Sequence, residues 1–568
     1  MRFAAKFLLG SFLVAVPGAA IALLVAQDAQ QRPAGSSSEA GAAYDVPGEE
    51  VATHETGNHK AVRLRLEGQG RIFQSVHLLL IVDSGGKVIS ATPKEGPSEA
   101  YPRAIAEAMS WKYVPFEKDG APTTAAIADD VRVLPPEELS KSHQDFPSTS
   151  NLAGLVMTLS RSGCYGTCAS YNIEIHGDGT AVYKGEGFVV LTGEHRDHLS
   201  AEQVSEIVEA FRKADYFSLK DGYSYSVTDC PTYKTSFRID QVEKSVTDYV
   251  GDEAGMPQSV SDLEETIDRV ADTGKWIRGD AQTVSALKKE EWDFKSPEAA
   301  KVLARASEAG NSALVSDLLA EGVGLSGASE TGNSALAAAA LAGDRTTVRM
   351  LIKAGAGKDD KQMKTEALAA AAEAGDLELV RLLLDYGADP KGQVRQEYRS
   401  NTVLMSAVGS GVPEIVETIL AAHPDVNARD EKGHTALWYL FSEENPSMDE
   451  KRHANRARVV HLVAHAGADL NAQDNEGNAA LHSAFDAEIA GALIQDGANV
   501  DIRNANGETP LMRNFSVDAD KLLVAAGADI HARNREGKTA VDLAQEMEPG
   551  GERARFLASL SSAKTVQN

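Results

Sequence analysis

Three cysteines are the residues of this chain best suited to chemistry, because a thiolate can attack a disulfide or bind a metal. They are Cys164, Cys168 and Cys230, and all three fall in residues 151–280. In an oxidising compartment, three cysteines form at most one intramolecular disulfide and leave one thiol. Because the Cys-x3-Cys spacing closes a very small loop, a Cys164–Cys168 bridge would mainly hold the intervening turn in one shape.

Thiol exchange at Cys164 and Cys168 is the alternative chemistry. It requires a thiolate pKa lowered by a nearby cation or by the N-terminus of a helix. Arg161 is the nearby cation, and Cys168 precedes a predicted strand rather than a helix. A structural disulfide and a redox protein or sensor centred on this pair both remain open.

Two histidine pairs could bind a metal. His461 and His465 lie one turn apart on a predicted helix, a spacing that can hold zinc, but they face outward and no third ligand is fixed nearby. His195 and His198 fall in a polar segment before a predicted helix, where we expect them to be solvated. We therefore predict no metal site and no cofactor.

Catalytic motifs are not found in the sequence. It lacks H-E-x-x-H, G-x-S-x-G, a phosphate-binding glycine loop and a dinucleotide fingerprint. Ser285 and Lys288 match S-x-x-K, a pattern that arises easily by chance in a helix. No catalytic residue can be named, and we predict that the chain is not an enzyme.

A repeated pattern in the C-terminal half sets the positions of most other residues. Gly477, Gly507 and Gly537 recur every 30 residues, and each follows a segment that begins with Gly-Ala-Asp or Gly-Ala-Asn. A turn-rich segment followed by two short helical segments, repeated about every 30 residues, predicts stacked helix pairs. One pair cannot bury its apolar face alone, so stability comes from contacts between neighbouring repeats.

The pattern resembles the ankyrin repeat, through Thr509-Pro510-Leu511, Thr435-Ala436-Leu437 and Ala480-Leu481-His482. The resemblance implies an α-solenoid of about eight repeats over residues 297–560, with 297–330 closing its N-terminal end. Thr509 is expected to cap a first helix, and Gly527 to end a second helix in the left-handed conformation.

Ankyrin-like arrays bind proteins through a concave face, which here would be formed by turn tips and first helices. Charged and amide side chains at the tips suit a protein partner with a mixed polar surface. The predicted protein-binding residues are Arg429, Asp430, Lys432, Trp438, Asn475, Glu476, Arg503, Asn506, Arg533 and Arg535.

One repeat departs from the others. Trp438, Tyr439 and Phe441 replace the small residues usual in a first helix, and residues 442–457 form an extra charged loop. The aromatic residues either compensate within the core of a distorted repeat or form a specialised contact surface, because insertions often map to the binding face.

The N-terminus predicts export. Arg2 and Lys6 precede an apolar run at residues 7–25, which is a signal peptide or an N-terminal membrane anchor within residues 1–28. Either would place the rest of the chain in the periplasm or elsewhere outside the cytoplasm, free or attached to the inner membrane. Residues 29–59 are rich in small and polar residues and are predicted to be a flexible linker.

Residues 60–136 predict a small α+β domain, with strands at 76–82, 87–92, 111–116 and 125–134 and a helix at 104–110. The hairpin Val82-Asp83-Ser84-Gly85-Gly86-Lys87 and the stretch Trp111-Lys112-Tyr113-Val114-Pro115 resemble the C-terminal domain of TonB-type energy transducers. That family captures a peptide by strand addition, although this chain continues far beyond the domain. Peptide capture at the envelope is a further alternative function.

Residues 151–280 predict a second α+β domain, with a hairpin at 172–183, helices at 201–214 and 261–272, and strands at 235–239 and 242–249. Its Cys164-x-Gly-Thr-Cys168 and Asp248-Tyr249-Val250-Gly251 motifs resemble an uncharacterised bacterial domain found beside ankyrin repeats.

The net charge of −27 is spread along the chain, because residues 297–568 contribute 40 Asp+Glu against 27 Lys+Arg. No basic stripe is present, which argues against nucleic acid as a partner. The sequence thus predicts a multidomain scaffold that binds a protein, and it does not specify the oligomeric state.

Overall fold

The computed structural model describes residues 44–563 except 47–50, 52–53, 55–58, 66–73, 119, 141–142, 397–398 and 442–449. The chain divides into two compact units, Met1–Pro136 and Glu137–Asn568. The predicted signal peptide or anchor lies outside the described residues. Among the described residues, no helix has the length and apolar character needed to cross a membrane.

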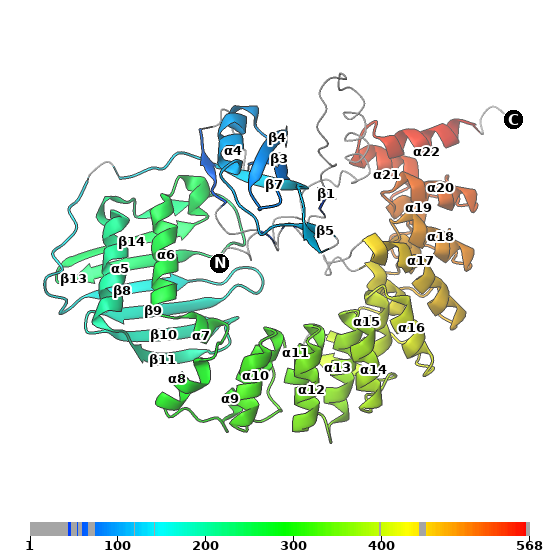
Figure 1. Cartoon of the computed structure of the whole chain (residues 1–568). Coiled ribbons are helices and arrows are strands. Elements are labelled where there is room, and N and C mark those ends of the chain that lie inside the picture. Colours follow the sequence, from blue (N-terminus) through cyan, green and yellow to red (C-terminus); the bar gives the residue numbers. More distant parts are fainter. Residues whose placement is uncertain are drawn as a thin grey trace. The chain divides into compact units, whose positions relative to one another are not determined.

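The first unit is a sheet of order β1-β7-β3-β4, with β2 also paired to β7, against which α4 packs (Figure 1). Alternating residues of β3 are buried, so one face of the sheet forms the core. The elements are β1 (Tyr44–Asp45), β2 (Val62–Arg63), β3 (Ser75–Val82), β4 (Val88–Glu95), η2 (Ser98–Ala100), α4 (Tyr101–Ala108), β5 (Glu117–Lys118), β6 (Ala121–Pro122) and β7 (Ala125–Leu134).

The predicted β3–β4 hairpin is confirmed. The Oδ1 atom of Asp83 accepts hydrogen bonds from the backbone N–H groups of Gly85 and Lys87, both at 2.9 Å. Gly86 has φ = 83°, and a Cβ there would lie 2.0 Å from the carbonyl oxygen of Tyr113. Glycine is therefore required at the turn.

Two predictions for this unit are wrong. The predicted linker, residues 29–59, contains β1, which pairs with β7, and Val46 and Val51 are buried in the core. These apolar side chains gain more from burial than a solvated tether would allow. The predicted strand at 111–116 is replaced by an isolated bridge at Lys112, while Trp111 and Phe116 are buried.

The second unit begins with a seven-stranded sheet of order β11-β10-β9-β8-β13-β14-β12, which is antiparallel except for β12 on β14. Helices α5 and α6 pack side by side over one face of it (Figure 1). Its elements are β8 (Val156–Arg161), β9 (Ser170–His176), β10 (Thr180–Gly187), β11 (Gly193–His198), α5 (Ala201–Lys213), η3 (Tyr216–Ser218), β12 (Gly222–Ser224), β13 (Tyr233–Ile239), β14 (Val242–Tyr249), η4 (Gly251–Ala254) and α6 (Gln258–Val270). The predicted hairpin, strands and helices are confirmed, with α6 starting three residues early.

Eight successive helix pairs follow among the described residues, reached through α7 (Gly274–Ile277) and α8 (Thr283–Lys289). The pairs are α9 (Pro297–Glu308) with α10 (Ser312–Ala320), α11 (Ala335–Leu341) with α12 (Arg345–Ala354), α13 (Lys361–Glu373) with α14 (Leu377–Asp385), α15 (Val403–Gly409) with α16 (Pro413–Leu420), η5 (Ala436–Phe441) with α17 (Glu450–His465), η6 (Ala480–His482) with α18 (Ala487–Gln495), α19 (Pro510–Arg513) with α20 (Val517–Ala525), and α21 (Ala540–Met547) with α22 (Glu552–Ala563). A hairpin of β15 (Gln393–Gln396) and β16 (Arg399–Thr402) precedes α15.

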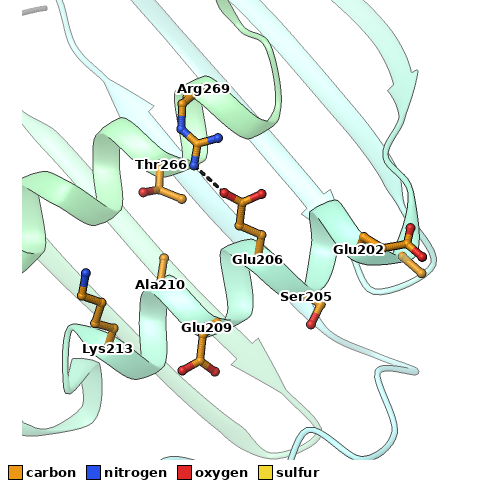
Figure 2. Close-up of a pocket in the computed structure, with 9 residues that line it drawn as sticks. Glu202, Ser205, Glu206, Glu209, Ala210, Lys213, Thr266 and Arg269 are labelled. Carbon is orange, nitrogen blue, oxygen red and sulfur yellow. Dashed lines mark hydrogen bonds and ion pairs between the residues drawn. The ribbon is translucent and has the colours of Figure 1, made fainter.

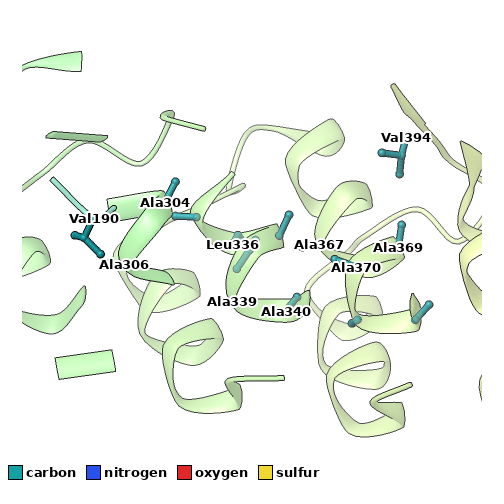
Figure 3. Close-up of a cluster of buried hydrophobic side chains, with 14 of the residues drawn as sticks. Val190, Ala304, Ala306, Leu336, Ala339, Ala340, Ala367, Ala369, Ala370 and Val394 are labelled. Atoms are coloured by element: carbon teal, nitrogen blue, oxygen red, sulfur yellow. The ribbon is translucent and has the colours of Figure 1, made fainter. Parts of the chain in front are cut away.

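Buried alanines let the first helices approach closely. Figure 3 shows Ala304, Ala339, Ala340, Ala367 and Ala370 along the contact between successive first helices, where all five are buried. Because alanine fills little volume, the helices α9, α11 and α13 pack directly against one another. One continuous core runs from the seven-stranded sheet to the last helix pair.

The structure corrects three expectations in the array. Thr509 makes no side-chain cap, because α19 is a single turn in which Met512 bonds to the Thr509 carbonyl oxygen instead. The predicted loop 442–457 is helical from Glu450 onward, while 442–449 lie outside the described residues. The first helix pair does not simply close the N-terminal end of the array. It also contacts the preceding domain, because Arg305 donates a hydrogen bond to the carbonyl oxygen of Val190.

Candidate functional site

The turns between helix pairs are linked by hydrogen bonds in the C-terminal half of the array, an arrangement we call the turn ladder. Each ladder residue donates from its side chain to the glycine carbonyl oxygen of its own turn, and Arg429, Gln473 and Arg503 also donate to the backbone carbonyl oxygen of the equivalent residue in the next repeat. Arg503, for example, donates to Gly507 at 3.0 Å and to Arg533 at 2.7 Å. The other ladder residues are Arg429 and Gln473, with Arg533 bonded to its own turn at Gly537.

A second set of bonds fixes the shape of each turn. The Oδ1 atom of Asp430 accepts from two backbone N–H groups of its own turn at 2.8 Å, and Asp474, Asn504 and Asn534 do the same in later repeats. Backbone N–H groups also cross between tips, as from Asn475 to the Lys432 carbonyl at 3.0 Å. The turns are therefore preorganised before any partner binds.

The structure thus divides the predicted binding residues into two groups. The side chains of one group make hydrogen bonds within the array: Arg429, Asp430, Asn475, Arg503 and Arg533. The other group is exposed at the turn tips: Lys432, Glu476, Asn506 and Arg535, of which Glu476 accepts a hydrogen bond from Asn478 Nδ2 at 3.3 Å. The sequence identifies both groups as polar tips but cannot separate them, because the ladder bonds join different repeats.

Trp438 differs from its aromatic neighbours. Tyr439 and Phe441 pack against the core, as expected for a repeat that compensates for its distortion. Trp438 is half-buried and stacks on His434, with ring centroids 4.6 Å apart.

The predicted Cys164–Cys168 disulfide is confirmed, and Cys230 is a free thiol. Strand β8 lies between β9 and β13, with Arg161 opposite both Tyr171 and Tyr233. Cys164 follows β8 by three residues, Cys168 precedes β9 and Cys230 precedes β13, so all three cysteines lie in segments that connect to neighbouring strands. Burial and the charge of Asp229 raise the pKa of the Cys230 thiol, which disfavours the reactive thiolate.

A buried polar cluster lies behind the disulfide loop. Tyr171 donates from its hydroxyl to Asp268 Oδ2 at 2.7 Å, and Thr273 donates to Asp268 Oδ1 at 2.7 Å. Burial raises the pKa of Asp268 despite these hydrogen bonds. The guanidinium of Arg161 lies 5.1 Å from the ring centre of Tyr233. The cluster ties α6 to the sheet, and sequence reasoning missed it because Asp268 resembles an ordinary helix residue.

The prediction that His195 is solvated is wrong. It is 4% exposed, with Nδ1 2.9 Å from Glu290 Oε2 and its ring stacked on Trp276. Nearby, the buried Lys275 Nζ lies 2.5 Å from Asp197 Oδ2. Burial acts to raise the pKa of Asp197, but the hydrogen bonds from Lys275 and the backbone outweigh it and hold that pKa below its usual range. These contacts join β11 to the helices that lead into the array.

In the pair of His461 and His465, one imidazole is hydrogen-bonded within the protein and the other is exposed. Nδ1 of His461 lies 2.8 Å from Asp496 Oδ2, while His465 is exposed. Throughout the described part of the chain, no group of three or more His, Cys, Asp or Glu side chains is arranged to hold a metal ion.

A shallow groove of about 660 Å³ lies between α5 and α6 (Figure 2). An ion pair between Arg269 and Glu206, with N and O 2.6 Å apart, crosses it. The other polar side chains of its lining point outward along the two helices, so the groove offers no enclosed site. Its lining residues are Ala201, Glu202, Ser205, Glu206, Glu209, Ala210, Lys213, Thr266 and Arg269.

Comparison with known families agrees with this architecture. Residues 303–394 and 368–449 match the model for ankyrin repeats in three copies, so the C-terminal half contains ankyrin repeats. Residues 155–271 match a domain of unknown function, DUF6438, which spans the disulfide loop. No curated protein matches the chain. The resemblance of residues 60–136 to TonB stays a prediction.

Proposed function

We propose that this chain is a non-enzymatic scaffold that binds a protein partner through the turn tips of its ankyrin array, outside the cytoplasm. The supporting observation is the turn ladder, which holds the tips in place while Lys432, Glu476, Asn506 and Arg535 remain exposed. A rigid tip loses little conformational entropy when its side chains bind, so it favours affinity.

Two observations support the proposed location. The apolar run at residues 7–25 follows two cations, as in exported proteins. The Cys164–Cys168 disulfide is of a kind that persists in oxidising compartments. A phosphatase fused after residue 563, active only when exported, tests the location: activity supports export, and its loss contradicts it.

Affinity capture tests the binding function. The full chain, and a variant with Lys432, Glu476, Asn506 and Arg535 changed to Ala, would be used to capture proteins from an envelope extract. A control variant changes Arg349, Lys353 and Asp385, which are exposed on second helices, and alters the net charge by the same amount. We expect one set of proteins to be lost with the tip variant only. Equal capture by all three chains would contradict the proposal.

Thiol–disulfide chemistry is a second candidate, favoured by the presence of the free thiol of Cys230 in the same domain as the Cys164–Cys168 bridge. Here the Cys230 thiolate would attack Cys164, forming a Cys164–Cys230 bond and releasing Cys168 as a thiolate. Mapping the disulfide before and after mild alkaline treatment tests this exchange. A bridge that stays between Cys164 and Cys168 supports a purely structural role.

A further inference from the structure

Two repeats near the C-terminal end of the array have lost part of their first helix. The segment between the cap positions of the first and second helices spans 334–344 in the repeat of α11. The corresponding segments, 479–486 and 509–516, are three residues shorter, which is about one helical turn. Elements η6 and α19 are consequently single turns.

Each shortened helix is followed by an exposed phenylalanine. Phe485 is 40% exposed and Phe515 is 56% exposed. Their rings touch, with centroids 5.0 Å apart and planes inclined by 57°. Phe441 has the same position in the preceding repeat and is half-buried. The two exposed rings, which we call the Phe485–Phe515 patch, form an apolar surface of the kind that marks an interaction site.

The surroundings of this patch are acidic. Residues 481–530 carry 8 Asp+Glu and 3 Lys+Arg. Glu488 and Asp518 are exposed three residues after each phenylalanine, in the first turns of α18 and α20, and Asp518 forms an exposed ion pair with Lys521 at 2.7 Å, which a basic ligand would replace. A ligand that combines apolar and basic side chains would complement this surface, whereas an anionic membrane would be repelled.

The spacing of the two rings indicates the form of the ligand. The ring centroids of Phe485 and Phe515 lie 5.0 Å apart. One turn of an α-helix rises by about 5.4 Å, so side chains three or four residues apart on one face of a helix have a similar spacing. An amphipathic helix can therefore present apolar side chains to both repeats from one stripe.

We propose that the Phe485–Phe515 patch is the docking site for a basic amphipathic helix of a protein partner. The apolar stripe of the helix contacts the two phenylalanines, and its Lys or Arg side chains pair with Glu488 and Asp518. The inference rests on the proposed protein-binding function and adds to it a surface separate from the turn tips and the chemistry of the partner.

The test uses the full chain and a fluorescein-labelled helical peptide of about 18 residues, or five turns, built from Leu on one face and Lys elsewhere. Binding is followed by fluorescence anisotropy. We expect F485S/F515S to raise the Kd at least about tenfold, which corresponds to 1.4 kcal/mol. Leu341→Ser, at a residue 39% exposed at the end of the complete first helix α11, is the matched control and should not change the Kd.

Several results would overturn the proposal. They are no binding of the Lys peptide, equal binding by F485S/F515S, or equal binding of a peptide with Glu in place of Lys. Binding to phosphatidylglycerol vesicles, or self-association, that is lost in F485S/F515S would assign the patch to a membrane or a second copy. Unchanged thermal unfolding of both variants confirms that they fold. If the peptide fails while the tip variant still loses its captured proteins, the patch is rejected and the proposed function stands.

Discussion

In the repeats of α11 and α13, the first helix is complete and its contact surface is rich in buried alanine, whereas in the repeats of η6 and α19 it is a single turn. The stack continues through both regions because the second helices α18 and α20 still pack against each other. The turn ladder adds hydrogen bonds between these neighbouring repeats, as from Gln473 to Arg503 and from Arg503 to Arg533. The comparison teaches that an array can lose part of one helix layer locally and gain an exposed apolar surface.

The largest expected effect tests whether a buried ion pair helps to hold the shortened region. Asp520 in α20 is 0% exposed and accepts from Arg553 Nε at 2.8 Å. Asp520→Ala would leave the guanidinium buried without its partner, at a cost of about 3–5 kcal/mol in the free energy of unfolding. Urea denaturation measures it. Asp518→Ala is the control, because that side chain is 74% exposed, and it should cost less than about 0.5 kcal/mol. Equal effects would contradict the role of the pair.

The Asp520 carboxyl should also make the stability of the chain depend on pH. Burial raises the pKa of Asp520 to about 6 although Arg553 acts to lower it. A raised folded-state pKa means that the stabilisation is complete below the unfolded value of 3.8 and is lost as the pH rises through about 6. Relative to Asp520→Asn, the natural chain should lose stability across this interval, by about 1.4 kcal/mol for each pKa unit. If the urea midpoints of the natural chain and of Asp520→Asn change by the same amount from acid to neutral pH, the expectation is wrong.

In the complete repeats the sensitive feature is the alanine layer. Ala339 in α11 is 0% exposed, and Ala339→Leu would force apart the neighbouring first helices at a cost of about 1–3 kcal/mol. The thermal midpoint should fall accordingly. Ala342→Leu, at an exposed position after the same helix, should leave the midpoint nearly unchanged. A similar decrease for both variants would mean that close packing at this layer is unimportant.

The smallest expected effect separates ladder residues from binding residues. Arg503→Ala removes two hydrogen bonds to backbone carbonyls at the surface, for a loss of about 1 kcal/mol in stability. Arg535→Ala, at an exposed tip, should change stability by less than about 0.5 kcal/mol and weaken partner binding instead. The distinction between the two groups fails if Arg535→Ala destabilises the array as much as Arg503→Ala does.

Sequence reasoning succeeded where the determinants are local. Recurring glycines reveal the repeats, the Asp83–Gly86 turn predicts its hairpin, and the four-residue spacing of Cys164 and Cys168 allows their bridge. These features depend on residues within a few positions of one another.

Contacts between distant residues were not predictable in the same way. His195 is buried by helices that follow about 80–95 residues later, and Val46 joins a core built mostly from later strands. The 30-residue spacing predicted stacked helix pairs, but only the structure shows that a missing helical turn leaves Phe485 and Phe515 exposed. The exposure of these two side chains depends on contacts between repeats, and the periodicity of the sequence does not reveal those contacts.

The most direct test of the central claim is a titration of the captured partner against the full chain and against the variant with Lys432, Glu476, Asn506 and Arg535 changed to Ala. The account predicts that the Kd rises at least about tenfold in the tip variant, or 1.4 kcal/mol, while the thermal midpoint stays the same. An unchanged Kd in a correctly folded tip variant would contradict it.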